Sequence, residues 1–386
     1  MLLLSALLTP LLYAEATKTI EPAFKTVWQK TYGGDRGDIA HGIVMLENGD
    51  SAIIGECQSY GAKRTDICVI RINSNGETKW RKIIKQERQD RGMAISRAKD
   101  GNLLILGSGK SFNDNYDRDI YVAKVSLDGK TIWEKTFGGD RDEFAGGIAG
   151  TDDGGALIVG DSESFSKRGY KDIYIIRIDG KGKVLSEKHI GGDKGEEAKA
   201  LTRTSDGNFM MVGSREVSRV GNADFFLMKL DQNGNKIWAR TVGEKGHDVL
   251  NGVAPTPDGG IVATGSTRSF GSEQTDMSVM HFNKDGKLIW HKIYGFKYYD
   301  EGNAITMTKD GGFMVAGVTN SMGEGDYDNY IVALDNRGSL IWSDLFGGRN
   351  RDMAHGISRT TDGSIIIVGE TNSYKRRSDF YMIKLQ

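Results

Sequence analysis

Six tryptophans recur at nearly constant spacing, and this repeat constrains the fold more than any other feature of the chain. They are Trp28, Trp80, Trp133, Trp238, Trp290 and Trp342, at intervals of 52, 53, 105, 52 and 52 residues. The long interval holds a seventh unit centred on Ser186, because GKVLSEKHIGGD (182–193) matches GKTIWEKTFGGD (129–140). A fixed period of this length indicates a solenoid, a propeller or an array of small units.

Each of the seven units repeats the same residue types at the same distances from its tryptophan position. An acid stands ten residues on, Gly or Ala fourteen residues on, and an Asn-Gly or Asp-Gly pair begins twenty residues on. The acids are Asp38, Asp90, Glu143, Glu196, Asp248, Asp300 and Asp352. Asn-Gly and Asp-Gly between apolar runs indicate hairpins, and no long window has helical periodicity. The pattern predicts four short strands per unit and an all-β fold.

Seven such units predict a seven-bladed β-propeller with four antiparallel strands per blade, because seven small sheets around an axis cover one another's faces. The last unit ends at 379–386 without an outer strand, whereas residues 24–33 form an outer strand without a sheet. We therefore predict that the N-terminal strand, about 24–33, pairs with about 379–385 and completes the last blade. The predicted single domain is 17–386.

The composition excludes several classes of protein. Gly is frequent, 52 of 386 residues, but there are only 4 Pro, so the glycines punctuate ordered structure rather than collagen or a disordered linker. A hydrophobic content of 38% excludes a polytopic membrane protein. A net charge of −1 argues against general nucleic-acid binding, which needs a basic surplus.

The first residues have the pattern of a secretory signal peptide. Residues 2–13 are almost wholly apolar, and Ala14-Glu15-Ala16 offers a small-x-small cleavage site, although no Lys or Arg precedes the apolar run. We predict a signal peptide over 1–16 and a periplasmic or extracellular location; the alternative is an uncleaved, buried segment. Cys57 and Cys68 flank a hairpin loop centred near 62–63, which predicts either a disulfide between opposite residues or two buried small side chains.

The repeat also resembles a known family. The string W-x-K-T-[YF]-G-G-D…D-x-A-x-G-I…T-x-D-G-G…V-x-G, as in 133–160, resembles the β-propeller repeats of the SBBP type in exported bacterial proteins, and the resemblance spans about 24–386. The string D-x-x-G-x-x-x-W, as in 231–238, is similar to the tryptophan-docking motif of quinoprotein dehydrogenases. The chain has seven units rather than eight and neither an adjacent cysteine pair nor a C-x-x-C-H haem motif, so we interpret that similarity as shared blade packing.

A functional site is expected where the seven copies differ. Thirteen residues after each tryptophan position the chain has His41, Met93, Gly146, Lys199, Asn251, Asn303 and His355. In a closed ring His355 and His41 lie in adjacent blades, beside Asn303 and Asn251, with Asp38 and Asp352 near the same rim. Two imidazoles and two carboxylates suit Zn²⁺ or another transition metal, and the alternative is a polar, water-filled channel. The repeated acids are expected to cap local backbone rather than to form a cation-attracting ring.

The variable loops are the second candidate site. Loops such as 57–66, 161–172 and 371–379 differ in length and charge, and binding residues concentrate on such loops. Their aromatic residues are Tyr60, Phe112, Tyr116, Phe165, Tyr170, Phe270, Tyr327 and Tyr374, and Tyr298 and Tyr299 join the same face. They either contact a ligand or fold back onto the blades.

The sequence favours binding over catalysis, because it contains no G-x-S-x-G, H-E-x-x-H or P-loop motif. We expect an exported, non-catalytic propeller that acts as a binding or scaffold protein, uses its variable-loop face for a protein or glycan, and needs no cofactor. A further hypothesis is a structural element of the cell surface. The alternative is a metal-dependent or redox enzyme with a site near His41 and His355.

Overall fold

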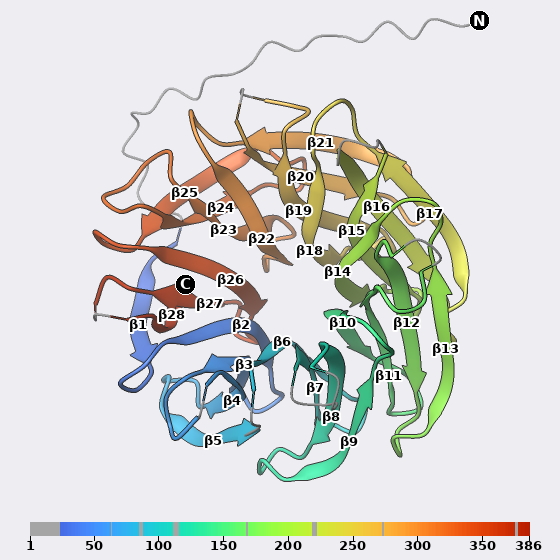
Figure 1. Cartoon of the computed structure of the whole chain (residues 1–386). Helices are drawn as coiled ribbons and strands as arrows, with labels where there is room; N and C mark the ends of the chain where they lie inside the picture. The colour runs from blue at the N-terminus through green and yellow to red at the C-terminus, as the bar shows by residue number, and fades with distance from the viewer. Residues whose placement is uncertain are drawn as a thin grey trace, which may run out of the picture.

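The computed structural model describes residues 24–62, 64–84, 88–110, 116–166, 169–217, 222–271, 274–374 and 377–386. These residues form seven four-stranded antiparallel sheets, arranged as blades around one axis (Figure 1). The prediction of a seven-bladed β-propeller is confirmed. The predicted signal peptide, 1–16, lies outside the described residues. Within the ranges given above, no helix has the length and apolar character needed to cross a bilayer.

Each of blades 1 to 4 runs from an inner strand at the axis to an outer strand at the rim. Blade 1 contains β2 (Asp38–Met45), β3 (Ser51–Cys57), β4 (Asp66–Ile72) and β5 (Thr78–Ile84). Blade 2 contains β6 (Asp90–Arg97), β7 (Leu103–Gly109), β8 (Asp119–Val125) and β9 (Thr131–Phe137). Blade 3 contains β10 (Glu143–Gly150), β11 (Ala156–Ser162), β12 (Asp172–Ile178) and β13 (Val184–Ile190). Blade 4 contains β14 (Glu196–Arg203), β15 (Phe209–Glu216), β16 (Ala223–Leu230) and β17 (Lys236–Val242).

Blades 5 to 7 follow the same order, except that the outer strand of blade 7 comes from the start of the domain. Blade 5 contains β18 (Val249–Pro255), β19 (Ile261–Thr267), β20 (Asp276–Phe282) and β21 (Leu288–Tyr294). Blade 6 contains β22 (Asp300–Met307), β23 (Phe313–Thr319), β24 (Asp328–Leu334) and β25 (Leu340–Phe346). Blade 7 contains β26 (Asp352–Arg359), β27 (Ile365–Thr371), β28 (Asp379–Leu385) and β1 (Thr26–Tyr32).

The ring closes through β1, which pairs antiparallel with β28, as predicted (Figure 1). Lys30 lies opposite Met382, and Lys25 and Gln386 exchange two backbone hydrogen bonds of 2.7 and 2.9 Å. A bulge at Val27 shifts the register, so that Trp28 rather than Val27 faces Lys384. The pairing covers an otherwise free edge of β28 with a strand more than 340 residues away in sequence.

The hydrophobic core is divided among the seven interfaces between neighbouring blades. Ile53 and Ile70 of blade 1, for example, form one cluster with Val368 and Met382 of blade 7. The tryptophans belong to these clusters: Trp133 packs at the interface of blades 2 and 3, as expected for blade packing. Because every blade supplies one side of each of two interfaces, the ring must be complete for its cores to be buried.

The tryptophan of blade 2, Trp133, contacts the D-x-x-G turn of blade 3. The Trp133 indole donates a 3.2 Å hydrogen bond to Gly180 O, and a Cβ on Gly182 would lie 2.9 Å from the indole. Gly182 also has φ +84°, so both the backbone conformation and the close indole favour glycine there. This contact explains the recurrence of D-x-x-G-x-x-x-W as blade packing.

The two faces of the ring are built differently. One face, the turn face, carries the D-x-x-G turns and the Thr-x-Asp-Gly turns, in which Gly154 N–H donates to Thr151 O and Asp153 accepts from the Thr151 hydroxyl. The opposite face, the loop face, carries the connections between blades and the loops between the second and third strands of each blade. The turn face is nearly uniform, whereas the loop face varies in length and sequence from blade to blade.

Candidate functional site

A β-bulge in each inner strand sets one residue apart from the strand pairing. The inner and second strands skip one residue in all seven blades, and the skipped residues are the column predicted from the sequence. They are His41, Met93, Gly146, Lys199, Asn251, Asn303 and His355, and all are half-buried. A bulge redirects the side chain of the extra residue, which gives this column its special position. Next to it, a Cβ on Gly252 would lie 2.8 Å from Ala304 Cα, so the small residues do let the inner strands crowd together.

Ring closure brings His41 and His355 together. Their ring centroids lie 5.3 Å apart, with 46° between the planes. His41 Nε2 lies 3.9 Å from Glu56 Oε1, and His355 Nε2 lies 4.0 Å from Glu370 Oε1. Burial, with smaller contributions from the neighbouring His41 and Arg351, lowers the pKa of His355 to about 3, so this imidazole is neutral at physiological pH.

The two asparagines of the column bind the next blade rather than remaining free. The Asn303 amide donates a 2.9 Å hydrogen bond to Ala354 O, and the Asn251 amide donates to Glu301 Oε1 at 2.6 Å and to Gly302 O at 3.2 Å. Their amide groups therefore hold neighbouring inner strands in place, and they offer less hydrogen-bonding capacity to a ligand than the sequence alone suggests.

Asp38 and Asp352 are fully buried and act as backbone caps. Asp38 accepts hydrogen bonds from Gly34 N–H at 3.0 Å and from Ser59 N–H at 3.1 Å, and Asp352 accepts from Gly348 N–H at 2.9 Å. Across the part of the chain that the structure describes, no three His, Cys, Asp or Glu side chains are placed to share a metal ion. The prediction of a metal site therefore depends on the His41–His355 pair.

The same capping role is seen elsewhere in the acid column, as the sequence led us to expect. Glu143 accepts from Gly139 N–H, in the connection into blade 3, at 2.8 Å and from the Ser162 hydroxyl, at the end of β11, at 2.7 Å. Asp248 accepts from the Thr267 and Ser269 hydroxyls, each at 2.6 Å. These carboxylates fix the bases of the loops on the loop face.

The side chain of Tyr298 is exposed on the loop face, whereas that of Tyr299 joins a hydrogen-bond network. Tyr298 is 48% exposed and stands on the loop face. The Tyr299 hydroxyl hydrogen-bonds the Glu301 carboxylate, and burial together with that carboxylate raises the pKa of Tyr299. Glu301 also accepts from Asn251, so Tyr299 belongs to the hydrogen-bond network at the axis.

The loop aromatics divide into exposed and folded-back side chains. The exposed ones are Tyr116, Phe165, Tyr170, Tyr298 and Tyr374. The half-buried ones are Tyr60, which packs under Arg81, Phe270, which packs against His291, and Tyr327, which packs against Tyr299. Phe112 lies outside the described residues. Folding back onto the blades is therefore seen for Tyr60, Phe270 and Tyr327, while ligand contact by the exposed aromatics stays a prediction.

The structure joins Cys57 and Cys68 in a disulfide with a Cα–Cα distance of 5.6 Å. The predicted register was wrong by two residues, because Cys57 lies opposite Asp66 and Cys68 lies opposite Gly55. The two cysteines are diagonal neighbours, which still lie within reach of a disulfide. The bond closes the base of the loop between β3 and β4.

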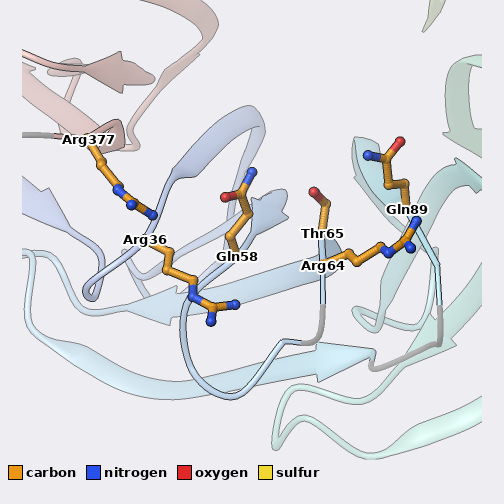
Figure 2. Close-up of a pocket in the computed structure, with 6 residues that line it drawn as sticks. All are labelled: Arg36, Gln58, Arg64, Thr65, Gln89 and Arg377. Atoms are coloured by element: carbon orange, nitrogen blue, oxygen red, sulfur yellow. The ribbon is translucent and has the colours of Figure 1, made fainter.

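Sequence reasoning missed a polar cavity of about 410 Å³ on the loop face (Figure 2). We call it the arginine groove, and its lining residues are Arg36, Gln58, Arg64, Thr65, Gln89 and Arg377. They come from the connection into blade 1, the disulfide-closed loop of blade 1, the connection into blade 2 and the loop of blade 7. The groove depends on ring closure, which brings Arg377 and Arg36 around the same cavity. The basic residues of these loops were the only sequence signal that could have indicated the groove.

The fold and its faces define the class of protein, a seven-bladed β-propeller. Neither a family model nor a curated protein matches the sequence. Solved structures share the fold. A Dyadobacter fermentans protein described as of unknown function aligns with a TM-score of 0.58 and 12% identity, over 95% of this chain and 99% of that one.

Two further solved structures resemble the chain at the level of fold. The Neurospora crassa Pan2 WD40 domain has a TM-score of 0.56 and 12% identity, with 94% of each chain covered. Drosophila Plexin A, solved in complex with Semaphorin 1b, has a TM-score of 0.52 and 9% identity, over 93% of this chain and 86% of that one. At these identities the likeness concerns the fold alone.

Proposed function

We propose that the protein is an exported, non-catalytic propeller that binds a protein or glycan through its loop face. The difference between the two faces carries this proposal. The turn face repeats nearly the same hydrogen-bonded turns, while the loop face presents exposed aromatics, charged side chains and the arginine groove on capped, rigid bases. Variable loops on a fixed scaffold are a common arrangement for binding sites.

The polar side chains near the axis hold strands and loops together, which supports a binding role over catalysis. Asp38, Asp352, Asn251 and Asn303 are engaged in hydrogen bonds that hold strands and loops together. A general acid or base needs a side chain that can reach a substrate proton. These four groups have structural partners instead.

Two features support export. The buried Cys57–Cys68 disulfide is suited to an oxidising compartment such as the periplasm or the extracellular space. The apolar segment at 2–13 with its small-x-small site fits a secretory signal. We also propose, on the repeat motifs, that the chain is a relative of the SBBP-type exported propellers.

Site-specific photo-crosslinking in living cells tests the proposal. A photoreactive phenylalanine analogue replaces Tyr298 or Tyr374 on the loop face, and Ile132 or Ile341 on the outer strands serves as the control, since all four side chains are exposed by 45–53%. We expect discrete adducts with an envelope protein or glycan from the loop-face positions alone. Adducts that form equally from the outer strands, or from none of the four positions, would refute a loop-face binding role.

A second candidate is a metal-dependent or redox site at the axis, favoured by the 5.3 Å separation of His41 and His355. Two adjacent imidazoles, one of them neutral at physiological pH, provide donors for Zn²⁺ or Cu²⁺. Titration calorimetry with each ion tests this idea: binding that disappears in the His41→Ala/His355→Ala variant supports it, and no binding to the native chain rejects it.

A further inference from the structure

The arginine groove collects three guanidinium groups that have no acidic partner among the described residues. Arg36, Arg64 and Arg377 line one cavity, and none of them forms an ion pair with a described carboxylate. Asp35 is exposed and next to Arg36 in sequence, but it does not line the cavity. Three like charges around one cavity create a positive potential that an anion relieves.

Several other loop-face arginines form ion pairs with acids. Arg351 lies 3.5 Å from Glu370, Arg215 lies 3.0 Å from Glu196, and Arg91 lies 2.9 Å from Glu56. Of the acids close to these residues in sequence, Asp38, Asp66, Asp90 and Asp379 are buried, whereas Asp35 is exposed. Arg36, Arg64 and Arg377 therefore differ from Arg351, Arg215 and Arg91, each of which lies within 3.5 Å of a glutamate.

The groove is held in shape by backbone contacts between three blades. Arg36 N–H donates to the Ser59 hydroxyl at 3.1 Å, and that hydroxyl donates back to Arg36 O at 3.2 Å. Asp38 N–H donates to Ser378 O and Asp90 N–H donates to Thr65 O, both at 2.8 Å, so blade 7 is tied to blade 1 and blade 1 to blade 2. These bonds fix the backbone from which the arginine side chains project, so less of the groove has to become ordered when a ligand binds.

The character of the lining points to a polar, extended ligand. Between the arginines stand the amides of Gln58 and Gln89 and the hydroxyl of Thr65, and none of the described residues that line the cavity is apolar. Figure 2 shows these side chains in a row from Arg377 through Gln58 to Gln89, rather than converging on one point. Protein interfaces usually contain an apolar or aromatic centre, which is missing here.

We propose that the arginine groove binds an acidic saccharide, with sugar carboxylates on the arginines and sugar hydroxyls on the amides and Thr65. Guanidinium groups pair with carboxylates through two parallel hydrogen bonds, and amides both donate to and accept from hydroxyls. This inference deepens the proposed function, on which it rests, by naming the ligand class and the part of the loop face that holds it. An acidic peptide is the competing ligand.

Calorimetry on the full chain tests the groove with tetragalacturonate as the probe. The comparison ligands are neutral cellotetraose, tetra-aspartate and inorganic sulfate. The variants are Arg64→Ala and Arg36→Ala/Arg377→Ala. Arg141→Ala is the matched control, because Arg141 holds the position of Arg36 in blade 3 and its N–H also donates to a serine hydroxyl, that of Ser164, at 2.9 Å. Thermal melting checks that each variant is folded.

We expect tetragalacturonate to bind the native chain and Arg141→Ala equally, and cellotetraose not to bind. Each groove arginine removed should weaken binding about ten-fold or more, and added salt should weaken it further. No binding of tetragalacturonate, an equal loss in Arg141→Ala, or equal or tighter binding of tetra-aspartate or sulfate would overturn the proposal. Crosslinked partners at Tyr298 or Tyr374 would then still support a loop-face binding role, so the two proposals fail separately.

Discussion

Asp161 gives a sharp test of the electrostatics at the axis. It lies in β11, is 3% exposed, and accepts a 2.5 Å hydrogen bond from Ala198 N–H of the next blade. Burial raises the pKa of Asp161 from its usual 3.8 to about 7; the Ala198 N–H and the nearby Lys199 oppose this rise, while Glu197 adds to it. The Asp161 carboxyl is therefore about half ionised at pH 7, and its charged form carries a cost in stability.

The sign of the pH dependence follows from the direction of this change. Between pH 3.8 and about 7 the folded protein keeps a proton that the unfolded chain has released, so the contribution of Asp161 to stability falls with rising pH and is constant above pH 7. Each pH unit across that interval is worth about 1.4 kcal/mol, which gives about 3 kcal/mol between pH 5 and pH 8 as an upper bound.

The Asp161→Asn variant should remove this penalty, because the asparagine oxygen can still accept the Ala198 N–H. Urea unfolding followed by tryptophan fluorescence at pH 5 and pH 8 measures the effect. We expect the variant to gain stability relative to the native chain on going from pH 5 to pH 8, by about 1–3 kcal/mol. For Asp206, burial raises the pKa, but hydrogen bonds from Lys229 and Thr204 outweigh burial and bring the pKa below its usual 3.8. Its contribution to stability is therefore lost only as the pH falls below about 4, and Asp206→Asn should show no change relative to the native chain between pH 5 and pH 8. The same difference between Asp161→Asn and native chain at both pH values would refute the reasoning.

Three further substitutions test the packing, the caps and the disulfide. Trp133→Ala should lower the free energy of unfolding by about 2–3 kcal/mol, because it opens the interface of blades 2 and 3 and removes the bond to Gly180 O; a loss below about 0.5 kcal/mol in a urea titration would contradict this role. Asp248→Ala should cost about 3 kcal/mol in the same assay, since it leaves the Thr267 hydroxyl without its acceptor in the interior; full stability would show that water replaces the carboxylate. Cys57→Ser/Cys68→Ser should cost about 3 kcal/mol by freeing a loop with a sequence separation of 11, and the native chain should approach the variant's stability when a reductant is added. An unchanged melting temperature in the variant would contradict the stabilising role of the disulfide.

The fold was predictable because the sequence pattern of one blade is repeated seven times. The spacing of Trp, the turn glycines and the capping acids each repeat in register, so an error in one unit is corrected by the other six. The closing strand followed from counting, since residues 24–33 were an outer strand without a sheet. The pairing of β1 with β28 confirms the predicted closing strand, but the bulge at Val27 was not predicted.

The site was less predictable, because it depends on details that do not repeat. The column of residues at the axis was identified from its variability, but the inner-strand bulges that aim it were not, since a bulge depends on pairing with the second strand. The hydrogen bond from the Asn251 amide to Glu301 was not predictable, because it crosses the interface between two blades and depends on how they pack. The arginine groove joins residue 36 to residue 377, and only the closed ring places them around one cavity.

The cysteine pair shows the same limit on a smaller scale. The sequence placed Cys57 and Cys68 on either side of one hairpin loop, and they do form a disulfide. The centre of the loop was misplaced, because the turn residues of a variable loop do not define its register. The disulfide therefore joins two diagonal cysteines rather than the directly opposite ones that we predicted.

The closure of the ring by β1 is most directly tested by a designed disulfide between Gln29→Cys and Ile383→Cys. These residues lie directly opposite each other, and opposite residues on antiparallel strands have Cα atoms about 4.5–5.5 Å apart, within the range of disulfides. Peptide mapping by mass spectrometry of the oxidised, folded chain should show a peptide that links positions 29 and 383 within one molecule. A chain in which these two cysteines stay free, or join only between molecules, would contradict a propeller closed by its N-terminal strand.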